Sequence, residues 1–502
     1  MELDQSDQSI DPIHLSVLEA AEAEVLPPEQ RLLGLYANYY CSLLRELDDR
    51  FIRNEITDEQ IELDWKHIEA GQLWASGYCD KSIQALILCV DYPNNGTHIL
   101  ANRLNAAQHI QWLKDGIEGS TQLHLPEMQA SLLNALGIAY RQLGQHEEAI
   151  RAYYRCIAIA EKINDPGLGH YMNNYGVVVL KMGRYKEAKE FYEAALQLFE
   201  QRQDPLAVQQ MMANLGVVYR NLGELGKASD LYQQALQTYR AQGDQRGESG
   251  ALENLGILAA LRNDYRNAEA LLNSALAISK KLEDFDGCSN TNTSLANLYA
   301  STERYEEAIS CLDNALTIDR QRNDKRGEII AMLGLGKLYA QILDKQKSLE
   351  AYQAAYHLSQ SANYVEHQAQ ALLNLGAQLM EDASTKDQAK AIFLEARTLA
   401  EQYHYLPVLA AVLTNLASLY EESKNNSTIQ YYEQSYDIFY QLEDYYNQAL
   451  VLCNIGMWHE KNNLGNEAEL SYQKAQRIFT ELQNLEWLEW VAKRLQAIHK
   501  SA

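Results

Sequence analysis

Proline and positively charged residues are both scarce in this chain, and each shortage limits what the chain can be. Only 8 of the 502 residues are proline, against a typical share of about 5%. Because proline disrupts the interior of a helix, this shortage indicates a mainly helical chain. Lys and Arg number 43 against 68 Asp and Glu, which gives a net charge of −25. A surface this acidic repels phosphate groups, so we expect neither nucleic acid nor an anionic membrane as the main partner.

Signals for disulfides, export and membrane insertion are also missing. The seven cysteines are an odd number without a Cys-x-x-Cys pair, whereas a disulfide framework or a zinc cluster needs closer and more regular spacing. The N-terminal sequence MELDQSDQSIDP is acidic and lacks the apolar stretch of a signal peptide. The sequence has no run of about 18 apolar residues that could span a membrane. We therefore expect a cytoplasmic protein with reduced thiols.

Motifs that carry chemistry are absent as well. The segment Gly223–Lys227 is too short for a phosphate-binding loop. The 12 histidines form no His-Glu-x-x-His pattern, and no Gly-x-Ser-x-Gly sequence marks a nucleophile. We therefore expect no catalytic site, no cofactor and no metal.

The chain does contain a repeat with a period of about 40 residues. Each unit predicts two helices, a first helix A and a second helix B, which in the third unit cover residues 206–221 and 225–242. In helix B, two small residues flank a large one, as Ala228 and Ala235 flank Tyr232. In helix A, one small residue recurs, at Gly137, Gly176, Gly216, Gly256, Ala296, Gly336, Gly376, Ala417 and Gly456. Small residues allow helices A and B to approach closely, and we expect the large side chains to fill the remaining space.

An acidic residue ends most units, and the spacing irregularities lie in turns. The acids are Asp165, Asp204, Asp244, Asp324 and Asp444. An Asp at this position can accept a hydrogen bond from a free backbone N–H of the next helix. Unit seven has one extra residue in its internal turn, 381–387, and unit eight lacks one in its own turn, 423–427. The helices therefore stay in phase, because loops tolerate such changes.

The sequence Asn214-Leu215-Gly216-x-x-Tyr219, followed by the spaced Ala228, Tyr232 and Ala235, resembles the tetratricopeptide repeat family. The resemblance covers about residues 127–483, with a period longer than the 34 residues usual in this family. It is similar to the longer repeats of kinesin light chains, of helical adaptors in cell-polarity complexes and of many bacterial regulators. The resemblance implies an all-α fold, a right-handed α-solenoid of about nine helix pairs, in which the A helices line a concave groove. One pair cannot bury its apolar face alone, so neighbouring pairs stack.

We expect four segments along the chain. These are an acidic tail at 1–12, an irregular helical N-terminal cap with a degenerate entry repeat at 13–126, nine repeats at 127–483, and a C-terminal capping helix at 484–502. In the cap, the stretch from Leu63 to Gly71 followed by Trp74 is similar to the helical segment that precedes the repeats in bacterial signalling ATPases of the multidomain switch class. The nucleotide-binding module of those ATPases has no counterpart in this sequence.

Asparagines recur two residues before the small position of helix A, where the resemblance places side chains in the groove. They are Asn174, Asn214, Asn254, Asn374, Asn415 and Asn454. Because an asparagine side chain both donates and accepts hydrogen bonds, a row of them can pair with the backbone of an extended peptide. The consecutive Asn174, Asn214 and Asn254 are the candidate contacts with a partner. The alternative is that these amides bridge neighbouring repeats inside the protein.

The charge on the same face changes along the chain. Four or five residues after the small position, the early units have Arg141, Lys181 and Arg220. The late units have acids there, namely Glu381, Glu421, Glu422 and Glu460. The three early cations favour an acidic peptide or a terminal carboxylate as the partner. The alternative is the ordinary charge of a solvated helix face.

Taken together, the absent motifs and the groove residues favour a non-catalytic scaffold or regulator that binds a peptide segment or a partner protein. The alternative hypothesis is the ligand-sensing arm of a signalling switch, with its ATPase or effector on another chain. An enzyme with an unrecognised site is the third hypothesis. The sequence contains no signal that fixes an oligomeric state.

Overall fold

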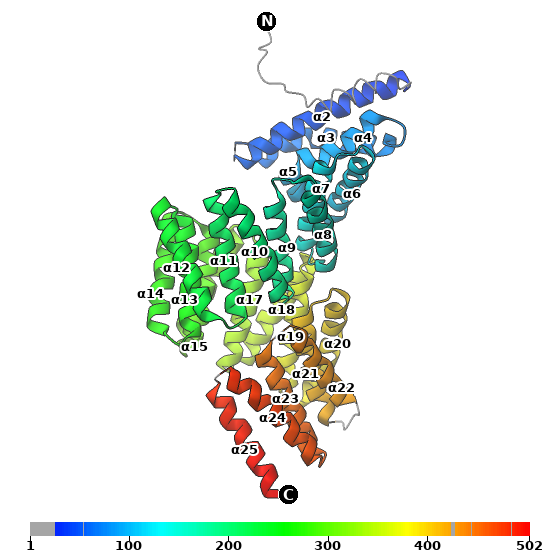
Figure 1. Ribbon diagram of the computed structural model, residues 1–502. Coiled ribbons are helices and arrows are strands. Elements are labelled where there is room, and N and C mark those ends of the chain that lie inside the picture. The colour runs from blue at the N-terminus through cyan, green and yellow to red at the C-terminus, as the bar shows by residue number, and fades with distance from the viewer. Residues whose placement is uncertain (1–25, 54, 423–426, 443, 483, 502) are drawn as a thin grey trace. The chain divides into compact units, whose positions relative to one another are not determined.

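The computed structural model describes residues 26–501 except 54, 423–426, 443 and 483 (Figure 1). Over these residues the chain forms α-helices and one short 3-10 helix, and it contains no β-strand. The all-α fold class predicted from the sequence is therefore confirmed. The acidic tail expected at 1–12 lies outside the described residues. None of the described helices combines the length and the apolar character needed to cross a bilayer.

The chain divides into two compact units, residues 1–175 and 176–502. One core of the first unit lies between α2, α3 and α4, where Leu44, Ile68 and Tyr92 are fully buried. The Tyr92 hydroxyl donates to the Ala37 carbonyl oxygen at 2.7 Å, which ties α4 to α2. The helices of this unit are α2 (Pro28–Ile52), α3 (Asp58–Tyr78), α4 (Ile83–Asn95), α5 (Thr97–Arg103), α6 (Ala106–Gln122), α7 (Pro126–Gln142) and α8 (His146–Ile163).

The boundary between the units falls within α9 (Leu168–Lys181), and the second unit continues as a succession of helix pairs. Its helices are α10 (Tyr185–Gln201), α11 (Pro205–Asn221), α12 (Leu225–Gln242), α13 (Gln245–Leu261), α14 (Tyr265–Lys281), α15 (Phe285–Ser301), α16 (Tyr305–Gln321), α17 (Lys325–Gln341), α18 (Lys345–Ser361), α19 (Val365–Met380), η1 (Ala383–Thr385), α20 (Lys386–Gln402), α21 (Leu406–Glu422), α22 (Ser427–Gln441), α23 (Tyr445–Lys461), α24 (Gly465–Glu481) and α25 (Leu485–Ser501).

From α10 onward, each helix packs on the next one in the chain (Figure 1). The described residues contain nine pairs, from α7/α8 to α23/α24, in the order expected of an α-solenoid. In the third pair, α11 and α12 agree with the predicted residues 206–221 and 225–242 to within one residue. At the end of the chain α25 packs on α24, where Trp487 stacks on Phe479 with ring centroids 5.6 Å apart.

Close packing between the two helices of a pair depends on the small residue in helix A. A Cβ added to Gly216 would lie 2.4 Å from Cε1 of Tyr232, and one added to Gly176 would lie 2.6 Å from Cε1 of Tyr192. Both tyrosines are fully buried. The rings therefore occupy the space that a larger residue would need, as the repeat pattern predicted.

The turns between units have the predicted caps. Asp204, Asp244, Asp324 and Asp444 each accept a hydrogen bond from a backbone N–H in the first turn of the following helix. The longer turn predicted in unit seven contains the 3-10 helix η1. Most of the shorter turn predicted in unit eight lies outside the described residues.

One contact in the second unit joins helices that are far apart in the chain. Lys181 Nζ at the end of α9 lies 4.0 Å from Glu366 Oε2 in α19. Two residues later, Gly183 lies against Leu442, so that an added Cβ would be 2.8 Å from Leu442 Cδ2. The first helices of this unit therefore touch its late helices directly, in addition to the contacts between neighbours.

Candidate functional site

The six side chains predicted to contact a partner are all half-buried on A helices. Arg141 on α7 and Asn174 on α9 belong to the first unit. The other four belong to the second unit and are Lys181 on α9, Asn214 and Arg220 on α11, and Asn254 on α13. None of the six is sealed in the core, and none is fully exposed.

The asparagines differ in their surroundings. Asn174 Nδ2 donates to Asn134 Oδ1 at 2.9 Å, so this amide bridges two A helices inside the first unit. Ser294, which has the equivalent position on α15, likewise donates to Glu253 Oε1 on α13 at 2.8 Å. Asn254 makes no hydrogen bond to any residue that the structure describes. Its amide is therefore available to a ligand, whereas that of Asn174 is already engaged.

The early cations differ in the same way. Lys181 pairs with Glu366, but Arg141 and Arg220 form no ion pair within the described part of the chain. Arg220 lies close enough to Glu253 to lower the pKa of that carboxyl, which opposes the effect of burial. Arg141 lies near the buried hydroxyl of Tyr153. Within the residues that the structure describes, two cations on A helices therefore form no ion pair with a carboxylate.

The late acids of the predicted charge gradient are largely engaged. Glu421 accepts from Lys461 Nζ at 2.6 Å, and Glu460 accepts from Arg494 Nη1 at 3.1 Å. Glu381 accepts from Gln378 Nε2 at 2.7 Å. The side chain of Glu422 is outside the described residues. The available charge on the A helices is therefore mainly the positive charge of the early units.

A cavity of about 300 Å³ opens between the A helices α13, α15 and α17, and Asp319 of the B helix α16 also lines it. Asn254 is the only predicted site residue that contributes to it. The lining residues are Glu253, Asn254, Ser289, Asn290, Thr293, Ser294, Asp319, Gly327 and Ile330. Gly327 makes room for the neighbouring acid, because an added Cβ would lie 2.5 Å from the carboxyl carbon of Asp319.

Two carboxyl groups surrounded by hydroxyls give this cavity its chemistry. Glu253 accepts from Ser294 at 2.8 Å and from Thr291 at 3.5 Å, and burial raises the pKa of its carboxyl. Asp319 is 2% exposed and accepts from Ser289 Oγ at 2.9 Å, and burial raises the pKa of this carboxyl too. Such a surface offers acceptors to N–H groups and to ammonium or guanidinium groups.

Sequence reasoning missed Glu253, Ser289 and Asp319. All three lie at positions outside those that the repeat pattern assigned to the groove. A useful signal was the local change in composition, because unit five replaces the asparagine by Ser294 and has Ser289 and Thr293 on the same helix. In the described residues, no group of three or more His, Cys, Asp or Glu side chains is arranged to hold a metal ion.

Comparison with known proteins identifies the repeats. A family model described as tetratricopeptide repeat matches residues 128–201, 208–281 and 288–361. Residues 128–361 carry tetratricopeptide repeats. The α-helix pairs α7/α8 to α17/α18 contain these repeats, so the family resemblance of this part of the chain is confirmed. No curated protein matches the chain.

Several solved structures are similar to parts of the chain. The structure of BtubC (BKLC) from P. vanneervenii has 22% identity and a TM-score of 0.37, and it covers 44% of this chain and 93% of its own. A Rap protein complexed with competence and sporulation factor has 13% identity and a TM-score of 0.42, with coverage of 66% and 98%. The Rap conjugation gene regulator of plasmid pLS20, in complex with the Phr* peptide, has 15% identity and a TM-score of 0.44, with coverage of 69% and 96%.

Proposed function

We propose that this chain is a non-catalytic scaffold or regulator that binds a peptide segment or a partner protein on the tetratricopeptide repeats of its second unit. The proposal rests on two polar side chains, one on α11 and one on α13, that form no ion pair or hydrogen bond with the described residues. Arg220 has no ion-pair partner in the described residues, and the Asn254 amide beside the cavity has no hydrogen bond there. A bound partner that replaces water at these groups gains about 0.5–1.5 kcal/mol for each neutral hydrogen bond.

The geometry suggests how an extended peptide would be held. Asn254 can donate to one backbone carbonyl and accept from one backbone N–H, which fixes the peptide without reading its sequence. Arg220 can hold an acidic side chain or a terminal carboxylate through charge-assisted hydrogen bonds. Glu253 and Asp319 can accept from N–H groups of a residue placed in the cavity. The preferred peptide would therefore carry an acidic group that faces Arg220 and an amide or basic group that faces the cavity beside Asn254.

The second candidate is the ligand-sensing arm of a signalling switch with its effector on another chain. The contact between Lys181 and Glu366 favours this candidate. A ligand that separates these two groups would change how the helices from α9 to α19 pack on one another. Small-angle scattering with and without the bound peptide tests this candidate. A change in the distance distribution supports the arm, and an unchanged distribution supports a passive scaffold.

Selection of peptides from a random display library on the purified full chain tests the first proposal. Selected peptides are then titrated against the wild type, Arg220→Gln and Asn254→Ala by fluorescence anisotropy. We expect at least tenfold weaker binding for Arg220→Gln, because a charge-assisted hydrogen bond contributes about 1.5–3 kcal/mol. Arg266→Gln on α14 is the matched control, because Arg266 is exposed and has no ion pair in the described residues.

The outcome is decisive in either direction. Weaker binding confined to the α11 and α13 variants supports the proposed surface. Equal binding by all three variants shows that the peptide is held elsewhere, and failure to select any peptide contradicts peptide binding itself.

A further inference from the structure

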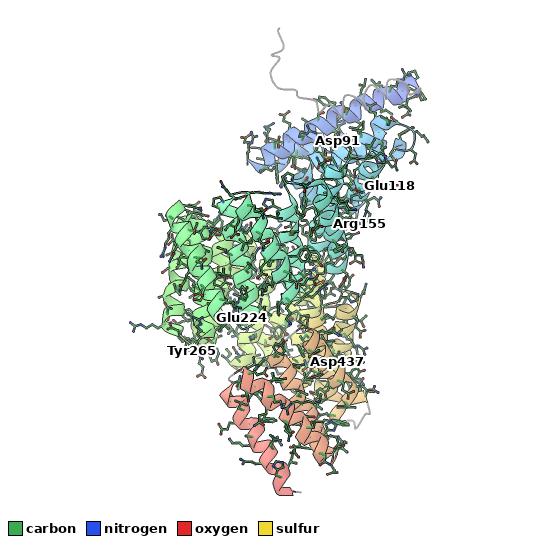
Figure 2. The ribbon with its side chains drawn as sticks, in the orientation of Figure 1. Asp91, Glu118, Arg155, Glu224, Tyr265 and Asp437 are labelled. Carbon is green, nitrogen blue, oxygen red and sulfur yellow. The ribbon has the colours of Figure 1, made fainter. Side chains whose placement is uncertain are left out.

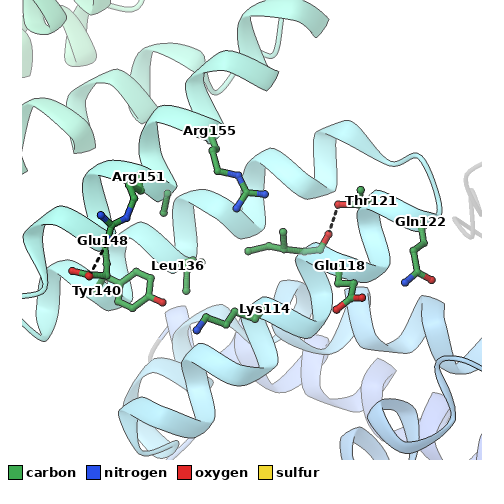
Figure 3. Close-up of a pocket in the computed structure, with 11 residues that line it drawn as sticks. Lys114, Glu118, Thr121, Gln122, Leu136, Tyr140, Glu148, Arg151 and Arg155 are labelled. Atoms are coloured by element: carbon green, nitrogen blue, oxygen red, sulfur yellow. Dashed lines mark hydrogen bonds and ion pairs between the residues drawn. The ribbon is translucent and has the colours of Figure 1, made fainter.

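The first unit contains a larger cavity that is separate from the surface discussed above. It has a volume of about 670 Å³ and lies between α6, α7 and α8 (Figure 3). Helices α6 and α8 contribute most of its walls, and Figure 2 labels Glu118 and Arg155 on these two helices. The lining residues are Lys114, Ile117, Glu118, Thr121, Gln122, Leu136, Tyr140, Glu148, Arg151, Ala152 and Arg155.

The floor of this cavity is apolar, and hydrogen bonds join two of its helices at the edge. Ile117, Leu136 and Ala152 are 7%, 6% and 5% exposed, respectively. Thr121 donates to the Ile117 carbonyl oxygen at 2.7 Å and accepts from Gln129 Nε2 at 2.6 Å, which fastens the end of α6 to α7. The cavity is therefore bounded by packed helices rather than by loops.

Two cations at the rim are unpaired within the described part of the chain. Lys114 on α6 and Arg155 on α8 form no hydrogen bond or ion pair with any residue that the structure describes. Figure 3 shows their side chains on opposite walls of the cavity. By contrast, the neighbouring Arg151 pairs with Glu148 at 2.7 Å. In a chain with a net charge of −25, two unpaired cations above one apolar floor mark a local preference for negative charge.

We propose that this cavity binds a small organic anion, with an apolar body on the floor and one carboxylate between Lys114 and Arg155. The volume falls in the range of about 300–1,000 Å³ that is usual for small-molecule sites. A guanidinium and an ammonium group can together hold both oxygens of one carboxylate. Glu118 and Glu148 at the rim oppose a polyphosphate, which carries several negative charges. This site is independent of the peptide surface on α11 and α13.

Calorimetric titration of the full chain with sodium octanoate tests the proposal. Acetate carries the charge without the apolar body, and octylammonium carries the apolar body with the opposite charge. We expect octanoate to bind with one site per chain, and acetate and octylammonium to bind at least tenfold more weakly. Lys114→Gln and Arg155→Gln should each weaken octanoate binding at least fivefold.

Matched controls separate a specific site from general charge effects. Lys474→Gln and Arg477→Gln change exposed cations on α24, and they should leave octanoate binding unchanged. Ala152→Leu fills the floor and should abolish binding. If this variant fails to fold, as judged by circular dichroism, the two charge variants still decide the question. Absence of octanoate binding at millimolar concentration, equal binding of octylammonium, or equal binding by all variants would overturn the proposal.

Discussion

At the scale of single residues, the small position in helix A leaves room for the large side chain that lies opposite it in helix B. Gly216 faces Tyr232 and Gly456 faces Tyr472, and in both places an added Cβ would lie within 2.6 Å of a ring carbon. Unit five has Ala296 in helix A with the smaller Leu312 in helix B, and both lie in one buried cluster. The methyl group of Ala296 therefore fits beside Leu312, but the match is not general, because Ala417 of unit eight lies in one buried cluster with Tyr432.

This relation predicts opposite effects for two glycines on A helices. Gly216→Ala should lower the free energy of unfolding by about 1–3 kcal/mol, the usual cost of overpacking a core. Gly250→Ala should raise it by about 0.5–1 kcal/mol, because nothing lies within 4 Å of an added Cβ and alanine favours the helix. Thermal and denaturant unfolding measure both changes.

A second substitution checks the cause. Tyr232→Leu combined with Gly216→Ala imitates the Ala296 and Leu312 pair, and it should be more stable than the sum of the two single changes predicts. Strictly additive losses would show that the ring of Tyr232 is not what excludes the methyl group.

The buried carboxyl of Glu253 leads to a prediction about pH. Its pKa is raised above the ordinary value of 4.5 by burial. The folded chain therefore binds more protons than the unfolded chain, and stability falls as the pH rises from about 4.5 through the raised pKa. Glu253→Gln should have a higher melting temperature than the wild type at pH 7 and an equal one at pH 4. Glu306→Gln, at an exposed position of α16, should show no such difference between the two pH values.

At the scale of the helices and turns, the turn inside most of the described repeats has one residue in the left-handed region. Gly183 and Gly223 have φ of 77° there, whereas the equivalent Leu343 has φ of 62°. Leu343 is 89% exposed, so its side chain contributes little packing. The left-handed conformation costs a residue with a Cβ about 1–2 kcal/mol in conformational energy, and it costs glycine almost nothing.

Leu343→Gly should therefore raise the free energy of unfolding by about 0.5–1 kcal/mol, after the entropy cost of glycine is subtracted. Leu470→Gly is the control, since Leu470 is 54% exposed but lies inside α24. That change should lower the free energy by about 1 kcal/mol. Denaturant unfolding would contradict the argument if both variants changed in the same direction.

The repeat pattern predicted the helices, the caps and the Gly–Tyr packing, because these depend on residues that are close together in the chain. Whether a groove side chain is already hydrogen-bonded depends instead on which residues the neighbouring units place beside it. The pattern placed Asn174 and Asn254 at equivalent positions, yet only Asn174 has an asparagine from the preceding unit, Asn134, to bind. The cavity around Glu253 and Asp319 was missed for the same reason, since three successive units build it.

At the scale of the second unit, the pairing of Lys181 with Glu366 could not be read from any local pattern. A double-mutant cycle with Lys181→Gln and Glu366→Gln tests it. We expect a coupling energy of about 0.2–1 kcal/mol, as for other partly exposed pairs, that decreases in 1 M salt. The exposed Lys493 and Glu489 pair on α25 is the control. Additive single effects would show that the α9–α19 contact is absent in solution.

The contact of Lys181 with Glu366, and of Gly183 with Leu442, also has a mechanical consequence. A stack in which every repeat contacts only its neighbours extends elastically under force, with the resistance distributed evenly along its length. A direct contact between early and late helices is an additional interaction that must break before the second unit can lengthen. Under tension the second unit should therefore yield once, abruptly, and only afterwards extend smoothly.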